Sequence, residues 1–146
     1  MNIKDFMTTS HRECDRLLAL AEDAVEKNNF IEASKKYAEF KAETLNHFSM
    51  EEDYLFLLLG ERSGMGESGP ISVMKMEHNQ ARILFDKLDE AIITSDAERF
   101  FALSESLMIL LQQHNTKEEQ ILYTMMQAVL GSESDAIVVK LMSYGK

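Results

Sequence analysis

Six residues interrupt the apolar stripes of this sequence with side chains that bind metals: His11, His47, Glu51, His78, His114 and Glu118. Two glutamates follow a histidine at a spacing of four, as His47–Glu51 and His114–Glu118. Residues four apart project from one face of a helix, so each pair points the same way. Imidazole and carboxylate without thiolate suit iron, manganese or zinc, and disfavour Cu(I) and iron–sulfur clusters.

The elements that carry these residues are predicted to be helices, because apolar residues recur every three or four positions. The stripes run from His11 to Val25, from Ala33 to Leu58, from Ile71 to Ile92 and from Phe100 to Met125. A short fifth helix is predicted from Asp135 to Ser143. Four long helices with short connections predict an all-α fold, an antiparallel up-down four-helix bundle.

Sparse turn signals separate these helices. Lys27-Asn28-Asn29 and Thr94-Ser95-Asp96 indicate two tight turns, with Ser95 or Asp96 capping the helix that follows. The stretch from Gly60 to Gly69 holds four of the six glycines and predicts a loop. Pro70, the only proline, suits the first turn of the next helix.

The four histidines are expected to meet in one layer of the bundle. The midpoint between His11 and His47 falls at the Asn29 turn, and the midpoint between His78 and His114 falls at Asp96. Residues equidistant from a turn lie at the same height on neighbouring helices. The two glutamates lie one turn beyond His47 and His114 and join the same layer.

A lone histidine on an apolar stripe is usually a satisfied core residue, and a lone His–Glu pair usually lies at the surface. Six such groups in one buried layer are different, since each unpaired buried polar group costs about 1–3 kcal/mol. A domain stable by only about 5–15 kcal/mol does not carry all six without a purpose. Six ligands exceed the four of a structural zinc site, and two carboxylates able to bridge favour a dinuclear centre.

Composition limits the remaining classes. The chain has 146 residues, 45% of them hydrophobic, which fits a single domain over 1–146. A net charge of -10 argues against nucleic acid and anionic membranes as partners, and no apolar run reaches the length of a membrane span. Cys14 is the only cysteine, and Met1 to Thr9 lack the apolar core of a signal peptide, which together predict a cytoplasmic protein.

With these motifs in place, the sequence resembles the hemerythrin-like family of His-His-Glu cation-binding domains. The resemblance covers nearly the whole chain, from about Phe6 to Met126. Its carriers are His11, the segment His47-Phe48-Ser49-Met50-Glu51, Glu77-His78, and the segment His114-Asn115-Thr116-Lys117-Glu118.

The resemblance implies a centre of two iron ions, with manganese or zinc as substitutes. Glu51 and Glu118 would bridge the irons, His11 and His47 would bind one, and His78 and His114 would bind the other.

The oxygen carriers of the family have a fifth histidine four residues after the third-helix histidine, where this chain has Arg82. Arginine is not a metal ligand, so water, an exogenous ligand or another side chain must fill the position. Tyr54 is a candidate, although an ordinary core aromatic is the slightly favoured interpretation. Arg82 itself either extends to solvent or holds an anion or carboxylate near the metal layer.

Other residues near the layer are assigned more ordinary roles. Glu52 and Glu119 are expected to be solvated or to support the ligands from outside, and Cys14 to be a small buried hydrophobe. Core filling rather than ligation is expected of the methionines Met7, Met50, Met74, Met76, Met125 and Met126.

The sequence as a whole predicts a non-haem di-iron protein that binds dioxygen or a related small oxidant such as peroxide or NO. An enzyme of the peroxidase or oxidase type, and an iron-handling or sensing protein, are the alternatives. A bundle with one structural or adventitious metal is the simplest competing hypothesis.

Overall fold

A computed structural model describes residues 1–145, and these form helices joined by short connections. The elements are α1 (Ile3–Glu26), α2 (Phe30–Met50), the π-helical η1 (Glu51–Leu55), α3 (Phe56–Ser63), α4 (Pro70–Ile93), α5 (Ala97–Lys117), the π-helical η2 (Glu118–Leu122), α6 (Tyr123–Leu130), the 3-10 helix η3 (Gly131–Glu133) and α7 (Ser134–Met142).

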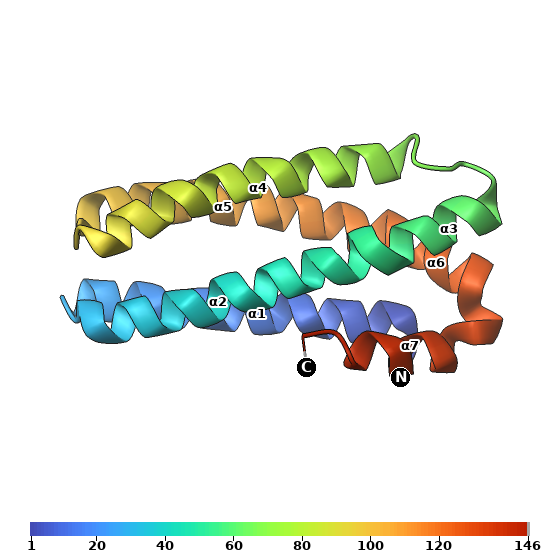
Figure 1. Cartoon of the computed structure of the whole chain (residues 1–146), viewed down its shortest axis with the longest axis horizontal. Helices are drawn as coiled ribbons and strands as arrows, with labels where there is room; N and C mark the ends of the chain where they lie inside the picture. Colours follow the sequence, from blue (N-terminus) through green and yellow to red (C-terminus); the bar gives the residue numbers. More distant parts are fainter. Residues whose placement is uncertain (146) are drawn as a thin grey trace.

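Two long helical hairpins make up the bundle (Figure 1). α1 packs along α2, and α4 packs along α5. The segments α3 and α6 prolong α2 and α5 at one end of the molecule, where α7 folds back against α1. The predicted all-α bundle and its short C-terminal helix are confirmed. None of the helices in the described part of the chain is long and apolar enough to cross a membrane.

The turns form where the sequence indicates them. The side chain of Asn29 accepts a hydrogen bond from the Glu32 backbone N–H, and that of Asp96 accepts one from the Arg99 N–H. Pro70 occupies the first turn of α4, as expected. The predicted loop is shorter at its start than the glycines indicate, because α3 continues to Ser63.

The second hairpin repeats the first at a constant offset of 67 residues. Ile3 and Glu26 bound α1 as Pro70 and Ile93 bound α4, and the same offset relates α2 to α5, η1 to η2 and α3 to α6. Few residues are identical across the offset, and they include all six predicted ligands as three pairs: His11 and His78, His47 and His114, Glu51 and Glu118. The two halves of the bundle can therefore be compared position by position.

Each π-helical segment begins at a glutamate of the predicted site. The Phe56 N–H donates to the Glu51 carbonyl and the Tyr123 N–H to the Glu118 carbonyl, so each of these turns holds one residue more than an α-turn. The extra residue rotates the following helix relative to an uninterrupted α-helical stripe. Sequence periodicity consequently fails beyond both glutamates.

Beyond both glutamates, this rotation moves residues of the predicted stripes off the buried face. Tyr54, Leu58, Ile121 and Met125 were expected on the buried stripes, and all four are instead half-buried or exposed. Their inward places are taken by Leu55, Phe56, Leu59, Leu122, Tyr123 and Met126. The predicted stripe from His11 to Val25 also includes Asp15, which is exposed, and the stripe from Phe100 to Met125 includes Leu103 and Leu110, which are half-buried.

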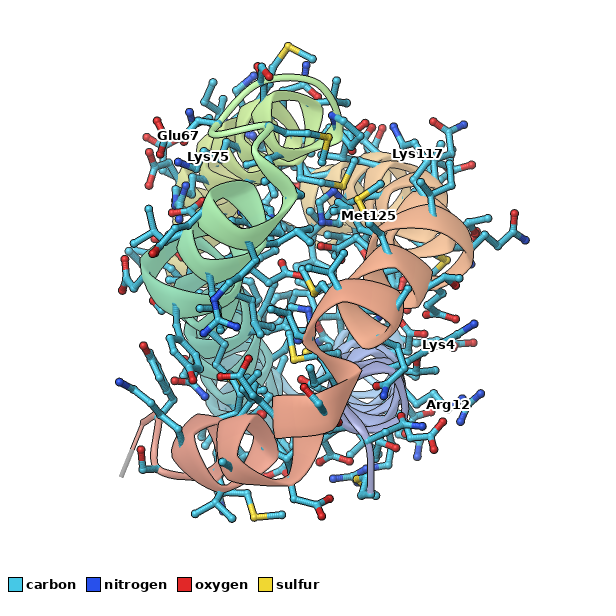
Figure 2. All side chains as sticks on the ribbon, turned by 90° about the vertical axis from the view of Figure 1, so that its right-hand side faces the viewer. Lys4, Arg12, Glu67, Lys75, Lys117 and Met125 are labelled. Carbon is cyan, nitrogen blue, oxygen red and sulfur yellow. The ribbon has the colours of Figure 1, made fainter. Side chains whose placement is uncertain are left out.

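Two apolar clusters form the core, one on each side of the histidine layer. One fills the end of the bundle near the tight turns, around Phe40, Phe85 and Phe100. The other fills the opposite end, where Ile137, Val138 and Leu141 of α7 belong to the same cluster as Met7 and Tyr123. Figure 2, an end-on view, shows side chains filling the space between the helices, with Lys4 and Arg12 on the outside.

We expect Gly60→Ala to destabilise the fold by about 1–3 kcal/mol, the usual cost of overpacking. A Cβ at residue 60 would lie 2.4 Å from the Gly66 carbonyl oxygen. Gly66 cannot easily move away, because its backbone N–H donates a hydrogen bond to the Gly60 carbonyl. Urea unfolding at fixed metal content measures the change. Gly131→Ala is the matched control, because a Cβ there meets only the movable Gln127 side chain. Equal effects of the two substitutions would contradict this packing.

Candidate metal centre

The structure brings all six predicted residues into one buried layer. They form two groups that share Glu51 and Glu118: one adds His11 and His47, the other His78 and His114. Within each group one potential ligand atom per residue lies within 4.8 Å of the others. None of the six side chains is more than slightly accessible, since their exposed fractions run from 0 to 4%.

The Nε2 atoms of the histidines face the two carboxylates. His11 Nε2 lies 3.0 Å and His114 Nε2 3.2 Å from Glu118 Oε1, while His78 Nε2 lies 3.1 Å from Glu51 Oε1. His47 Nε2 is 3.4 Å from Glu51 Oε2. Each glutamate thus lies between histidines of both hairpins, as a bridging ligand would.

The opposite ring nitrogen, Nδ1, has its own partner in every case. His11 Nδ1 lies 2.7 Å from Glu119, and His78 Nδ1 lies 2.6 Å from Glu52. A proton on Nδ1 donated to these carboxylates leaves Nε2 free as a ligand, and it fixes the orientation of the ring. Glu52 and Glu119 therefore hold the predicted ligand histidines from outside the layer, one of the two roles expected for them.

The other two partners were not assigned from the sequence. His114 Nδ1 lies 2.9 Å from Glu77, whereas His47 Nδ1 lies 2.8 Å from the Ser10 hydroxyl. Ser10 and Glu77 occupy equivalent positions of the two hairpins, each directly before a ligand histidine. Their position beside the histidine was the only available signal.

Arg82 holds a carboxylate and does not enter the ligand layer. Its guanidinium donates to Glu52 at 2.9 Å and lies over the Phe48 ring, with its charged carbon 5.6 Å from the ring centroid. Lys117 pairs in the same way with Glu77. Both carboxylates that support His78 and His114 are thus neutralised by a cation.

A tyrosine that sequence reasoning did not select lies in the centre of the layer. The Tyr123 hydroxyl donates to Glu51 Oε2 at 2.6 Å and lies 3.1 Å from Nε2 of both His11 and His47. It is also 3.1 Å from Glu118 Oε1. Tyr54, the candidate from the sequence, is half-buried outside the layer, where the Lys140 ammonium lies 4.7 Å from its ring centroid. Tyr123 is inward because the π-turn places the fifth residue after Glu118 on the buried face.

The equivalent position in the first hairpin is Phe56, which adds no polar atom. Its ring stacks on His78 at a centroid distance of 6.0 Å, and Phe48 stacks on the same histidine at 3.9 Å. We call His11, His47 and Tyr123 the tyrosine half of the site. His78, His114 and Phe56 are the phenylalanine half.

Four buried atoms show that the residues fit a cation. Glu51 Oε1, His78 Nε2, His114 Nε2 and Glu118 Oε2 have no hydrogen-bond partner of acceptable geometry, although all four are shielded from solvent and His78 Nε2 lies 3.1 Å from Glu51 Oε1. Such atoms are costly unless something binds them. All four belong to the group that contains the phenylalanine half, and each is a lone-pair donor suited to a metal.

The electrostatics show how strongly these groups depend on one another. Burial alone would raise the pKa of Glu51, but the attraction of His47 and hydrogen bonding with its neighbours hold that pKa well below its usual range. Burial lowers the pKa of His114, yet the nearby carboxylates, Glu118 first, raise it to about 9. Burial and the charges of Glu118 and Glu51 raise the pKa of Tyr123. A metal ion must therefore displace protons from this network.

The remaining expectations concern sulfur. Cys14 is buried, and burial raises the pKa of its thiol to about 12, as expected for a small buried hydrophobe. Of the six methionines that were expected to fill the core near the layer, four are buried in the cluster beside it: Met7, Met50, Met74 and Met126. Met125 packs partly against that cluster, but Met76 is 53% exposed and fills no gap.

The family model described as the hemerythrin HHE cation-binding domain matches residues 2–126. The chain belongs to this family. The hemerythrin match ends within α6, so α7 lies outside it. No curated protein and no solved structure matches the chain. Family membership and the buried histidine–glutamate layer agree in indicating a hemerythrin-type cation site.

We expect Glu118→Ala and His47→Ala to differ in metal content. Glu118 belongs to both groups, so its loss should empty the centre, whereas His47 belongs to one and its loss should leave one metal ion. Metal analysis by mass spectrometry after loading measures this. His114→Ala is the matched control for the other half and should also retain one ion. Full metal content in all three variants would refute this ligand assignment.

Glu52→Ala should weaken metal binding by about 10–100-fold, the usual effect of removing a residue that orients a ligand histidine. Only the ion at the phenylalanine half should be affected, because Glu52 supports His78. Competition with a chelator gives the affinity. Glu13→Ala is the control, since among residues 1–145 Glu13 forms an ion pair with Arg16 alone, on the outer side of α1. An unchanged affinity in Glu52→Ala would show that the Nδ1 contact plays no part.

Proposed function

We propose that this hemerythrin-family protein binds two iron ions in the buried layer and there binds dioxygen or a related small oxidant. The observation that carries the proposal is the pair of four-residue groups that share Glu51 and Glu118. Two shared carboxylates with two imidazoles on either side match the needs of a dinuclear centre. The unsatisfied atoms at the phenylalanine half support a cation there in particular.

Iron is favoured by the donor set. Carboxylate and imidazole without thiolate suit ferrous and ferric iron, and manganese or zinc would be accepted by the same ligands. When bound, iron supplies the redox chemistry and the affinity for oxidants that protein side chains lack. The chain contributes the rest: it orients four Nε2 atoms, holds their Nδ1 protons and excludes water.

A small, neutral ligand is favoured by the surroundings. The layer is buried on all sides, so a bulky substrate would not reach it without a rearrangement of the helices. Phe48 and Phe56 give the phenylalanine half an apolar wall, and Arg82 is held by Glu52 away from the ligand layer. That half has no fifth protein ligand among the described residues, which leaves room for an exogenous one.

An enzyme is the second candidate, because the same vacant position at the phenylalanine half suits an oxidant that is consumed. Peroxidase- or oxidase-type chemistry needs a vacant position of this kind. Binding and turnover are separated by adding peroxide to the loaded protein. A binder should give one stoichiometric spectral change, whereas an enzyme should consume many equivalents without bleaching.

The proposed function is tested by anaerobic purification, metal analysis and an absorption spectrum before and after admission of air. We expect two iron ions per chain, one for each group, and an oxygen-dependent spectrum of a carboxylate-bridged iron pair. Azide should bind and shift that spectrum if a position is vacant. Two zinc ions with no response to oxygen would refute the iron and oxidant assignment but keep the dinuclear site.

Removing the metal should lower the melting temperature without unfolding the bundle. Ligand binding to the folded state contributes about 3–4 kcal/mol when the metal is at 100–1,000 times its Kd. The apoprotein should stay helical, because apolar clusters lie on both sides of the layer. Circular dichroism melts with and without chelator measure both effects. A melting temperature that does not move on chelation would argue against a core site.

A further inference from the structure

The two halves of the site differ at equivalent positions of the repeated hairpins. Tyr123 and Phe56 each follow a shared glutamate by five residues, and each is the first residue after a π-helical segment. Both side chains are fully buried against the layer. Only Tyr123 presents an oxygen to the ligand atoms, at 3.1 Å from Nε2 of His11 and of His47.

We propose that the Tyr123 phenolate is a fifth protein ligand to the metal bound by His11 and His47, and that the tyrosine half therefore takes the more highly charged ion. The inference rests on the proposed metal centre. On binding, the phenol O–H bond breaks, an oxygen–metal bond forms, and the proton leaves to solvent. Glu51, which accepts the 2.6 Å hydrogen bond of the phenol, loses that hydrogen bond when the proton leaves and then has both oxygens available as ligands.

The contacts of the hydroxyl support ligation over a purely structural role. A buried tyrosine needs one hydrogen-bond acceptor, and Glu51 supplies it. Tyr123 additionally approaches two histidine nitrogens and Glu118, all of which belong to the same four-residue group. Its oxygen thus lies where lone pairs from four potential ligands converge, so a small shift of the phenol lets an ion enter among these atoms with the phenol oxygen beside it.

The charged side chains around the layer also make the tyrosine half more negative than the phenylalanine half. At the phenylalanine half, the carboxylates of Glu52 and Glu77 are each paired with a cation, Arg82 and Lys117 respectively. At the tyrosine half, Glu119 pairs with His11 but with no lysine or arginine of residues 1–145. The residue one turn after His11 is Asp15, where the phenylalanine half has Arg82.

The phenolate adds one more negative charge to the half that already carries the excess. A buried site with more negative charge favours a cation of higher charge, since little solvent screens the attraction. The tyrosine half should therefore hold trivalent iron while the phenylalanine half holds divalent iron. The divalent ion at the phenylalanine half is then also the ion with a vacant coordination position.

The first test uses ultraviolet difference absorption during metal titration of the full chain, which detects ionised tyrosine whichever metal binds. The parent protein and Tyr54→Phe should both give a tyrosinate signal, and Tyr123→Phe should give none. Phe56→Tyr should add a second signal, since it places a phenol at the equivalent position. A signal that survives in Tyr123→Phe, or metal binding by the parent without a tyrosinate signal, would overturn the inference.

The second test assigns the phenolate to one half with ferric iron, which gives a visible charge-transfer band with a phenolate ligand. His114→Ala keeps the tyrosine half and should keep the band, whereas His47→Ala should lose it. During stepwise reduction with dithionite the parent should take up one electron with the band retained, leaving ferric iron beside Tyr123. Loss of the band with the first electron would overturn the charge assignment.

These outcomes distinguish a failure of the proposed metal centre from a failure of ligation by Tyr123. A chain that binds no metal defeats the proposed function and this inference together. A chain that binds two metal ions without ionising a tyrosine defeats only the inference. Retained metal in Tyr123→Phe, with the signal lost, establishes that the variant is folded and that the lost signal belongs to Tyr123.

Discussion

The burial of two carboxylates, Glu51 and Glu118, in the middle of a helical bundle is the constraint on which the rest of the structure depends. Neither side chain is exposed, and buried charges are tolerated only when they are paired or bind a cation. Four histidines supply the first set of partners. Their rings are oriented in turn by Ser10, Glu52, Glu77 and Glu119, so the polar groups extend in two shells from these glutamates to the surface.

The layer itself could be predicted because it depends on quantities that sequence carries directly. Helices rise by the same amount per residue, so equal distances from the Asn29 and Asp96 turns place His11 level with His47 and His78 level with His114. The apolar stripes likewise predicted the number of long helices but not their ends, since α1 begins at Ile3, before the predicted stripe, and α3 continues to Ser63. The Nδ1 partners of His47 and His114 were harder to predict. Ser10 and Glu77 directly precede a different histidine in the sequence, and the direction of their side chains depends on how the helices pack.

Tyr123 could not be found from an α-helical period. The stripe after Glu118 continues through Ile121 and Met125, and after Glu51 through Tyr54, yet those side chains face outward or lie half-buried. One additional residue in each π-turn moves Tyr123 and Phe56 onto the inner face. Apolar residues such as Ile121 are compatible with either register, so nothing in the sequence distinguished them. The only signal was the hairpin repeat, which places an aromatic residue, Phe56 or Tyr123, five positions after each shared glutamate.

The repeated hairpin explains why the site is nearly symmetric, and the substitutions within it explain why its halves are not equivalent. Two copies of one helical pair place His–Glu pairs at matching heights without any further specification. The two halves then differ locally: a phenol stands in place of a phenyl ring, and Arg82 stands in place of Asp15 one turn from the histidine. These differences change charge and lone pairs but not backbone length, so the helices keep the same lengths in both halves.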